Sequence, residues 1–176
     1  MKFLLNLFMS SSPQASSSGL VLFAILHHIS AALGLIFAEM VSIDGPRVLW
    51  AVIAVLFLIP HLVFGSLILY RGWKAVQDGG ARSTAGKAVG FTFIPFFNFY
   101  WIFVAFYGLL QEFNRVLTAR GRSDAKVSEG FGLTYCILVL VSCALCFVPF
   151  AALPATAFEI VFIWQVIGAV KVLENG

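Results

Sequence analysis

Long apolar runs constrain this chain more than any other feature of its sequence. The runs 19–41 and 49–70 are each long enough for one membrane-spanning helix, and 130–171 is long enough for two, divided by Pro149 and Pro154. Because 61% of the 176 residues are hydrophobic and only 11% are charged, a water-soluble globular fold is excluded. We therefore predict an all-α, polytopic transmembrane helical bundle with four spanning helices.

A fifth apolar segment, 88–110, has Pro95 and Asn98 in its middle. Pro95 removes a helical hydrogen bond and disfavours helix at the residue before it. Asn98 can cap a helix that starts at Phe99. We predict a structural turn over 94–98 between a short entering piece and an amphipathic exit helix, 99–117. The segment would then be re-entrant, and the alternative is an ordinary Pro-kinked fifth span.

The basic residues favour the re-entrant form. If 88–110 enters and leaves on one side, ten of the eleven Lys and Arg residues gather there, and only Arg47 lies on the other side. Basic residues in short loops mark the cytoplasmic face, so we predict cytoplasmic N- and C-termini. The ten are Lys2, Arg71, Lys74, Arg82, Lys87, Arg115, Arg120, Arg122, Lys126 and Lys171.

Six of these residues form basic loops that we expect to contact anionic lipid headgroups: Arg82, Lys87, Arg115, Arg120, Arg122 and Lys126. The net charge of +3 is small and lies in short loops, so no nucleic-acid partner is predicted. The start of the chain, 1–18, is interpreted as an interfacial segment followed by a flexible Ser-rich linker over 10–18. The rest, 19–176, is predicted to be a single transmembrane domain.

Three histidines in the apolar helices are the candidate binding residues: His27, His28 and His61. Their positions on consecutive antiparallel helices put them at nearly one depth, roughly 12–14 Å from the cytoplasmic surface at about 1.5 Å per residue. An interhelical hydrogen bond, to Ser66 or to a carbonyl, is the favoured interpretation. Ligation of a haem or a chlorophyll is the alternative, since small residues beside them leave room for a flat macrocycle or a close helix neighbour. No carboxylate is apparent at their level, and no metal site is predicted.

Two acids lie within apolar runs, Glu39 and Glu159, and both are expected near the outer face. A water-facing carboxylate is the favoured interpretation for each, and a shared ion or proton site is the alternative. Cys143 and Cys146 are spaced as C-x-x-C, yet a membrane thiol oxidoreductase needs a second redox pair, and only Cys136 remains. With no recognisable catalytic set, the chain is predicted not to be an enzyme.

The block 86–116 carries a short motif that resembles a signature of uncharacterised bacterial multi-pass membrane proteins, P-F-F-N-x-Y-W followed by an amphipathic stretch that ends in Asn. The matching residues are Pro95, Phe96, Phe97, Asn98, Tyr100, Trp101 and Asn114. The resemblance covers about a fifth of the chain. It implies a bacterial origin, and hence the inner membrane, and it implies no activity.

Taken together, these features predict a non-catalytic integral membrane subunit or scaffold that packs in a larger membrane-protein assembly. Its expected partners are membrane lipids and other integral membrane subunits. Two alternatives stay open: a haem- or chlorophyll-binding subunit that uses the intramembrane histidines, and a small transporter or channel around Glu39, Glu159 and Asn98.

Overall fold

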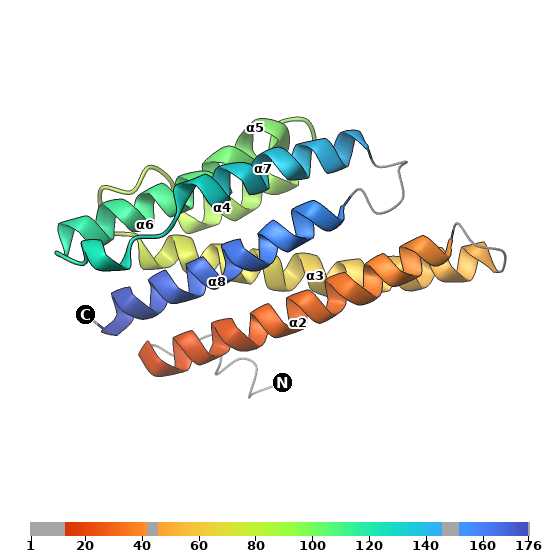
Figure 1. Cartoon of the computed structure of the whole chain (residues 1–176), viewed down its shortest axis with the longest axis horizontal. Helices are drawn as coiled ribbons and strands as arrows, with labels where there is room; N and C mark the ends of the chain where they lie inside the picture. The colour runs from red at the N-terminus through yellow and green to blue at the C-terminus, as the bar shows by residue number, and fades with distance from the viewer. Residues whose placement is uncertain (1–12, 42–45, 146–151, 176) are drawn as a thin grey trace.

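The computed structural model describes residues 13–41, 46–145 and 152–175, and in these the chain is helical with no strand. Four of its helical stretches are long and apolar enough to cross a membrane: Gly19–Met40, Arg47–Ala75, Ser123–Ala144 and Leu153–Asn175. They lie roughly along one axis and form a bundle (Figure 1). The predicted all-α bundle with four candidate spans is therefore confirmed.

The first two helices form a long antiparallel pair. Helix α2 covers Pro13–Met40 and α3 covers Arg47–Ala75. Helix α2 begins earlier than expected, so the prediction of a flexible linker up to residue 18 is wrong for residues 13–18. Pro13 is the first helical residue, where its missing N–H costs nothing because the first N–H groups of a helix have no partner. The predicted interfacial segment over 1–12 lies outside the described residues.

Helix α3 contains a proline, Pro60, directly before His61. A proline inside a helix removes the hydrogen bond that its N–H would give to the carbonyl four residues earlier, here Leu56. The half of α3 before Pro60, here called its outer half because it lies away from the basic loops, resembles a lipid-facing helix. It carries many exposed apolar side chains: Val48, Leu49, Val52, Val55, Leu56, Leu58 and Ile59.

The last two helices, α7 (Glu129–Ala144) and α8 (Leu153–Asn175), pack against each other, and α8 also packs on α2 and α3. The core gathers where α8, α3 and the aromatic segment meet, around the fully buried side chains of Trp73, Phe113, Leu109 and Val166. Gly72 allows this packing, since a Cβ there would come within 2.9 Å of the Leu109 side chain.

The aromatic segment reverses direction, as the re-entrant prediction requires. Its entering arm is α4 (Ala85–Gly90) with the 3₁₀ turn η1 (Phe91–Phe93), and its exit arm is α5 (Asn98–Ile102), the π-helical turn η2 (Phe103–Tyr107) and α6 (Gly108–Ala119). The reversal falls at residues 94–97, where Phe96 has a positive φ of 63°. The Trp101 indole donates to the carbonyl of Ala88 at 3.0 Å and joins the two arms.

The reversal at 94–97 falls within the turn predicted over 94–98, but Asn98 does not cap the helix that follows. Helix α5 begins at Asn98 itself, and no side chain caps it. Asn98 Oδ1 is buried without a hydrogen-bond partner, because the residue is inside the first helical turn and not ahead of it. Its side chain instead lines a cavity, as described below.

The exit arm is fixed to the bundle through its π-helical turn. A π-helical turn widens the helix and leaves carbonyls without their usual donors. Trp73 Nε1 donates to the carbonyl of Ala105 at 2.8 Å, and Cys136 Sγ lies 3.5 Å from the carbonyl of Ile102. Side chains from α3 and α7 therefore meet the backbone of the exit arm at depth.

The basic loops lie at one end of the bundle. Arg115 of α6 binds Asp78, which follows α3, and Arg120 donates to the carbonyl of Leu173 near the end of α8 at 2.8 Å. This end is on the left in Figure 1, together with the C-terminal end of α8. Among the described basic residues, only Arg47, at the start of α3, lies at the opposite end.

Candidate functional site

Two of the three histidines meet inside the bundle. His27 of α2 and His61 of α3 stack with their ring centroids 4.1 Å apart and their planes at 24°. His27 is buried, and its Nδ1 lies 2.9 Å from the carbonyl oxygen of His61. A carbonyl only accepts, so Nδ1 carries the proton and donates it. This interhelical hydrogen bond to a carbonyl is the interpretation favoured from the sequence.

The close approach of the two helices depends on Gly65. A Cβ at this position would lie 2.9 Å from His27 Cε1 and 3.2 Å from His27 Nδ1. An alanine would therefore displace the imidazole from its hydrogen bond. The small residue expected to leave room for a neighbour makes room for this histidine ring.

Glu159 of α8 completes the cluster. One of its carboxylate oxygens lies 3.2 Å from His27 Nε2, and the Tyr135 hydroxyl of α7 donates to that oxygen at 3.2 Å. The Glu159 side chain is only 15% exposed, so the prediction of a water-facing carboxylate is wrong for this residue, and a carboxylate does lie at the histidine level. The depth of Glu159 was misjudged because, at the end of the bundle away from the basic loops, α2 and α3 extend beyond α8, which starts at Leu153 (Figure 1).

The tautomer of His27 has a chemical consequence. With its proton on Nδ1, a neutral His27 presents a bare lone pair on Nε2, and an ionised Glu159 also presents only lone pairs. Two acceptors 3.2 Å apart repel, so a positive charge is required between them: a proton or a metal ion.

Further polar atoms of this region have no hydrogen-bond partner. His61 Nδ1 and Asn98 Oδ1 are both buried and unpaired among the described residues. Unpaired buried polar groups are rare in proteins and are more costly in a membrane than in water. Both residues line one cavity of about 270 Å³, together with Glu159 and Tyr135.

A second cavity, of about 330 Å³, lies on the other side of the cluster along the bundle axis. The first cavity follows α3 from His61 inward to Leu69, and the second follows α3 from His61 outward to Ala54. Two residues, His61 and Glu159, line both cavities. Glu39 lines neither, so the described cavities do not bring the two glutamates together as a shared site.

The arrangement does not fit a haem held between His27 and His61. Two axial histidines bind a haem iron from opposite faces, so the macrocycle must lie between their rings. The rings of His27 and His61 are instead in direct contact at 4.1 Å.

His28 does not belong to the cluster. Its ring meets that of His27 edge-on, with centroids 5.4 Å apart, and both of its ring nitrogens lack a hydrogen-bond partner in the described structure. Neighbouring residues on a helix point about 100° apart, so His28 leaves the α2–α3 interface where His27 enters it. It lines neither cavity.

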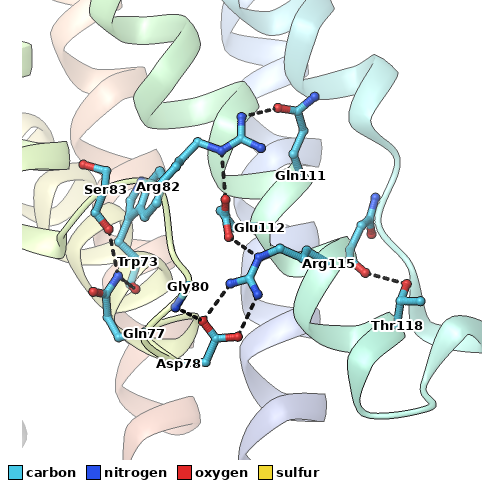
Figure 2. Close-up of polar contacts among 11 residues, drawn as sticks. Trp73, Gln77, Asp78, Gly80, Arg82, Ser83, Gln111, Glu112, Arg115 and Thr118 are labelled. Atoms are coloured by element: carbon cyan, nitrogen blue, oxygen red, sulfur yellow. Dashed lines mark hydrogen bonds and ion pairs between the residues drawn. The ribbon is translucent and has the colours of Figure 1, made fainter.

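A second polar cluster lies at the basic end of the bundle and is centred on the buried Glu112 (Figure 2). Arg82 Nε donates to one oxygen of Glu112 at 2.8 Å, and Arg115 Nε donates to the other at 2.6 Å. Arg115 also donates two hydrogen bonds, each 2.8 Å long, to Asp78. These contacts join the exit arm of the aromatic segment to the loop after α3.

The charges of this cluster shift the pKa values of its carboxyl groups. Burial by itself would raise the pKa of Glu112, but the hydrogen bonds from Arg115 and Arg82 outweigh it and leave the pKa below its ordinary value. The hydrogen bond from Arg115 likewise holds the pKa of Asp78 well below its ordinary range. Both carboxyl groups are therefore ionised at neutral pH.

The predicted lipid-headgroup residues divide into two groups. Three of the arginines hold the fold together: Arg82 and Arg115 bind Glu112, and Arg120 binds the end of α8. Arg122 has a longer contact of 3.5 Å with Asp124. Lys87 and Lys126 are exposed at the same end, where a headgroup can reach them.

Sequence reasoning missed three of the residues that organise these clusters: Glu159 as the partner of His27, Tyr135 and Glu112. An acid inside an apolar run was the available signal for Glu159, and it was assigned to the wrong depth. Asn114 of the short motif also has a structural role, because its amide binds both the N–H and the carbonyl of Val127 and the carboxylate of Glu129.

No protein-family model, curated protein or solved structure matches this chain.

Proposed function

We propose that this protein is a small transporter or channel for a cation, with its binding point at the cluster of His27, His61 and Glu159. The observation that carries the proposal is that the two cavities on either side of this cluster share His61 and Glu159. Ionisable residues at depth in a membrane protein are costly, and they commonly mark an ion pathway.

The chemistry of the cluster favours a cation. The side chains that meet at the two cavities carry atoms with lone pairs: the carboxylate of Glu159, Nε2 of His27 and one ring nitrogen of His61. Asn98 adds a carbonyl oxygen on the inner side. Among the described residues, no Lys or Arg lines either cavity, so an anion would find no basic partner there.

The geometry also favours a gated route over an open pore. His61 and Glu159 line both cavities, and both contact His27, by ring stacking and at 3.2 Å respectively. A cation that passes from one cavity to the other must therefore displace these contacts. Such an occluded point between two cavities is typical of transporters, whose sites lie near the middle of the bilayer.

The proposal is tested by cation flux into proteoliposomes that contain the purified protein. Uptake of H⁺, Na⁺ and Co²⁺ is followed separately with indicator dyes inside the vesicles, under a fixed membrane potential. We expect flux of at least one cation above that of empty vesicles, and a loss of most of it in Glu159→Gln. Glu39→Gln is the matched control, because Glu39 is also an acid in an apolar helix but lines neither cavity.

Absence of flux for all three cations would refute the transport proposal. So would equal losses in Glu39→Gln and Glu159→Gln, because the route would not then depend on the cluster. Monodisperse elution of each variant in detergent checks that a lost flux does not come from a misfolded protein.

A role as a subunit of a larger membrane assembly is the second candidate. It is favoured by the tip of the aromatic segment, where Phe96 is 85% exposed and Phe93 and Tyr100 are more than half exposed. A photo-crosslinking residue at Phe96 should give protein adducts in native membranes if a partner subunit covers the tip. The same residue at Leu56, which is exposed on the outer half of α3, is the control and should give lipid adducts alone.

The membrane itself is proposed to be a bacterial inner membrane, with the basic end of the bundle in the cytoplasm. The proposal is supported by the gathering of nine described Lys and Arg residues at one end and by the rule that basic loops stay cytoplasmic.

A further inference from the structure

The cluster between α2, α3 and α8 has the composition of a metal site. One ring nitrogen of His27, one of His61 and one carboxylate oxygen of Glu159 all lie within 4.8 Å of one another. We infer that these three residues bind one divalent transition-metal ion of the zinc type. This deepens the proposed function, on which it rests, by naming the class of cation.

The spacing is close to what a bound ion requires. Zinc binds nitrogen and oxygen ligands at about 2.0–2.2 Å, so neighbouring ligands of a tetrahedral site lie roughly 3.4 Å apart. His27 Nε2 and the Glu159 oxygen are already 3.2 Å apart. The lone pair of an imidazole lies in the plane of its ring, so the His61 ring must turn out of its stack with His27 to share the ion, while His27 keeps its hydrogen bond.

His27 is held in the orientation that a ligand needs. A histidine that binds a metal through one nitrogen usually donates the N–H of the other nitrogen to a carbonyl or a carboxylate, which fixes its tautomer. Nδ1 of His27 makes this bond to the carbonyl of His61 at 2.9 Å and leaves Nε2 free to bind the ion. The Tyr135 hydroxyl orients the Glu159 carboxylate in the same way.

A metal ion explains the unpaired atoms better than a shared proton does. A proton between Nε2 of His27 and the Glu159 oxygen, which lie 3.2 Å apart, would satisfy these two atoms alone. It would also leave His61 Nδ1 buried without a partner. An ion accepts lone pairs from several directions, so one ion can be shared by His27, His61 and Glu159.

The ligand types select the class of ion. Two imidazoles and one carboxylate suit zinc and its neighbours, whereas magnesium and calcium need more oxygen ligands. Cys136 lines the inner cavity, but its sulfur lies against the carbonyl of Ile102 at 3.5 Å. Three protein ligands leave a fourth position open toward the cavity, where an ion can exchange.

Zinc binding to the tag-free, full-length protein in detergent tests the inference. Isothermal titration with Zn²⁺ should give one ion per chain, with an affinity at least tenfold weaker in His61→Gln and in Glu159→Gln. His28→Gln is the matched control and should bind as the wild type does, because His28 is the neighbouring histidine that lines neither cavity. Gly65→Ala changes none of the three ligand residues but displaces the His27 ring, and it should weaken binding about tenfold or more.

A second measurement does not depend on any variant. Co²⁺ bound to the wild type should give the intense visible bands of a tetrahedral site, and Zn²⁺ should abolish them by displacement. Absence of Zn²⁺ binding by the wild type, octahedral Co²⁺ bands, or equal weakening in His28→Gln and His61→Gln would each overturn the inference. Flux of H⁺ or Na⁺ without Zn²⁺ binding would leave the transport proposal standing, whereas binding without any flux would leave only the metal site.

Discussion

The buried carboxylate of Glu112 offers the sharpest test of how the aromatic segment is held. Its side chain is 2% exposed, and each oxygen accepts a hydrogen bond from a different arginine, Arg82 and Arg115. Replacing Glu112 with Gln keeps the shape of the side chain but removes its charge and turns one acceptor into a donor group. That donor then faces a guanidinium, which has no acceptor.

The cost follows from the number and exposure of these bonds. A hydrogen bond to a charged group contributes about 1.5–3 kcal/mol, and at least one of the two is lost outright. The arginine side chains are 51% and 38% exposed, so water screens part of the interaction and solvates the arginine that is left behind. We therefore expect Glu112→Gln to lower the free energy of unfolding by about 2–3 kcal/mol.

The measurement is reversible unfolding in a mild detergent with increasing denaturant, followed by tryptophan fluorescence. Trp73 is fully buried beside this cluster and reports its loss. Asp124→Asn is the control, because its 3.5 Å contact with Arg122 is exposed and should contribute less than about 1 kcal/mol. If both variants unfold within about 0.5 kcal/mol of the wild type, Glu112 does not hold the segment, and the argument from buried ion pairs fails.

Three further predictions concern pH, the turn and the threading of the chain. The pKa of Glu112 is lower in the folded protein than in the unfolded chain, so ionised Glu112 should stabilise the fold fully above the unfolded pKa of about 4.3. This stabilisation should be lost as the pH falls below that value. The free energy of unfolding should therefore drop at low pH in the wild type and much less in Glu112→Gln. Asn98→Leu should leave the unfolding free energy within about 0.5 kcal/mol of the wild type, since the side chain caps no helix, and a larger loss would reveal a partner for its amide. Single cysteines at the exposed positions Gly86 and Ser123, in a background without native cysteines, should both resist an impermeant thiol reagent added outside. Labelling of one alone would mean that 88–110 spans the membrane.

The fold was largely predictable because lipid imposes a simple rule. Backbone groups in a bilayer must be paired within the segment, so long apolar runs become helices, and the four runs became the four candidate spans. The reversal at Pro95 was predictable for a related reason, since proline removes a helical donor. The π-helical turn at Phe103–Tyr107 was not, because it depends on Trp73, which is distant in sequence and reaches the carbonyl of Ala105.

The candidate site was predictable only in part. The shared depth of His27 and His61 followed from helix lengths and antiparallel direction. The partner on α8 did not, because the position of Glu159 depends on how far the α2–α3 pair extends beyond the other helices. Helix offset is set by tertiary packing, around Gly65 and the Tyr135 side chain among others, and no single run of residues encodes it.

The proline in α3 gives this helix two mechanically different halves. Its inner half packs into the core around Trp73, while its outer half carries mostly lipid-facing side chains. Pro60 has no N–H to donate to the carbonyl of Leu56, so this backbone hydrogen bond is absent and bending at this point does not break it. His61 is the next residue, and its carbonyl holds His27. A tilt of the outer half of α3 by a few degrees would therefore change the length of the hydrogen bond between His27 and the His61 carbonyl. The same movement would change the width of the outer cavity.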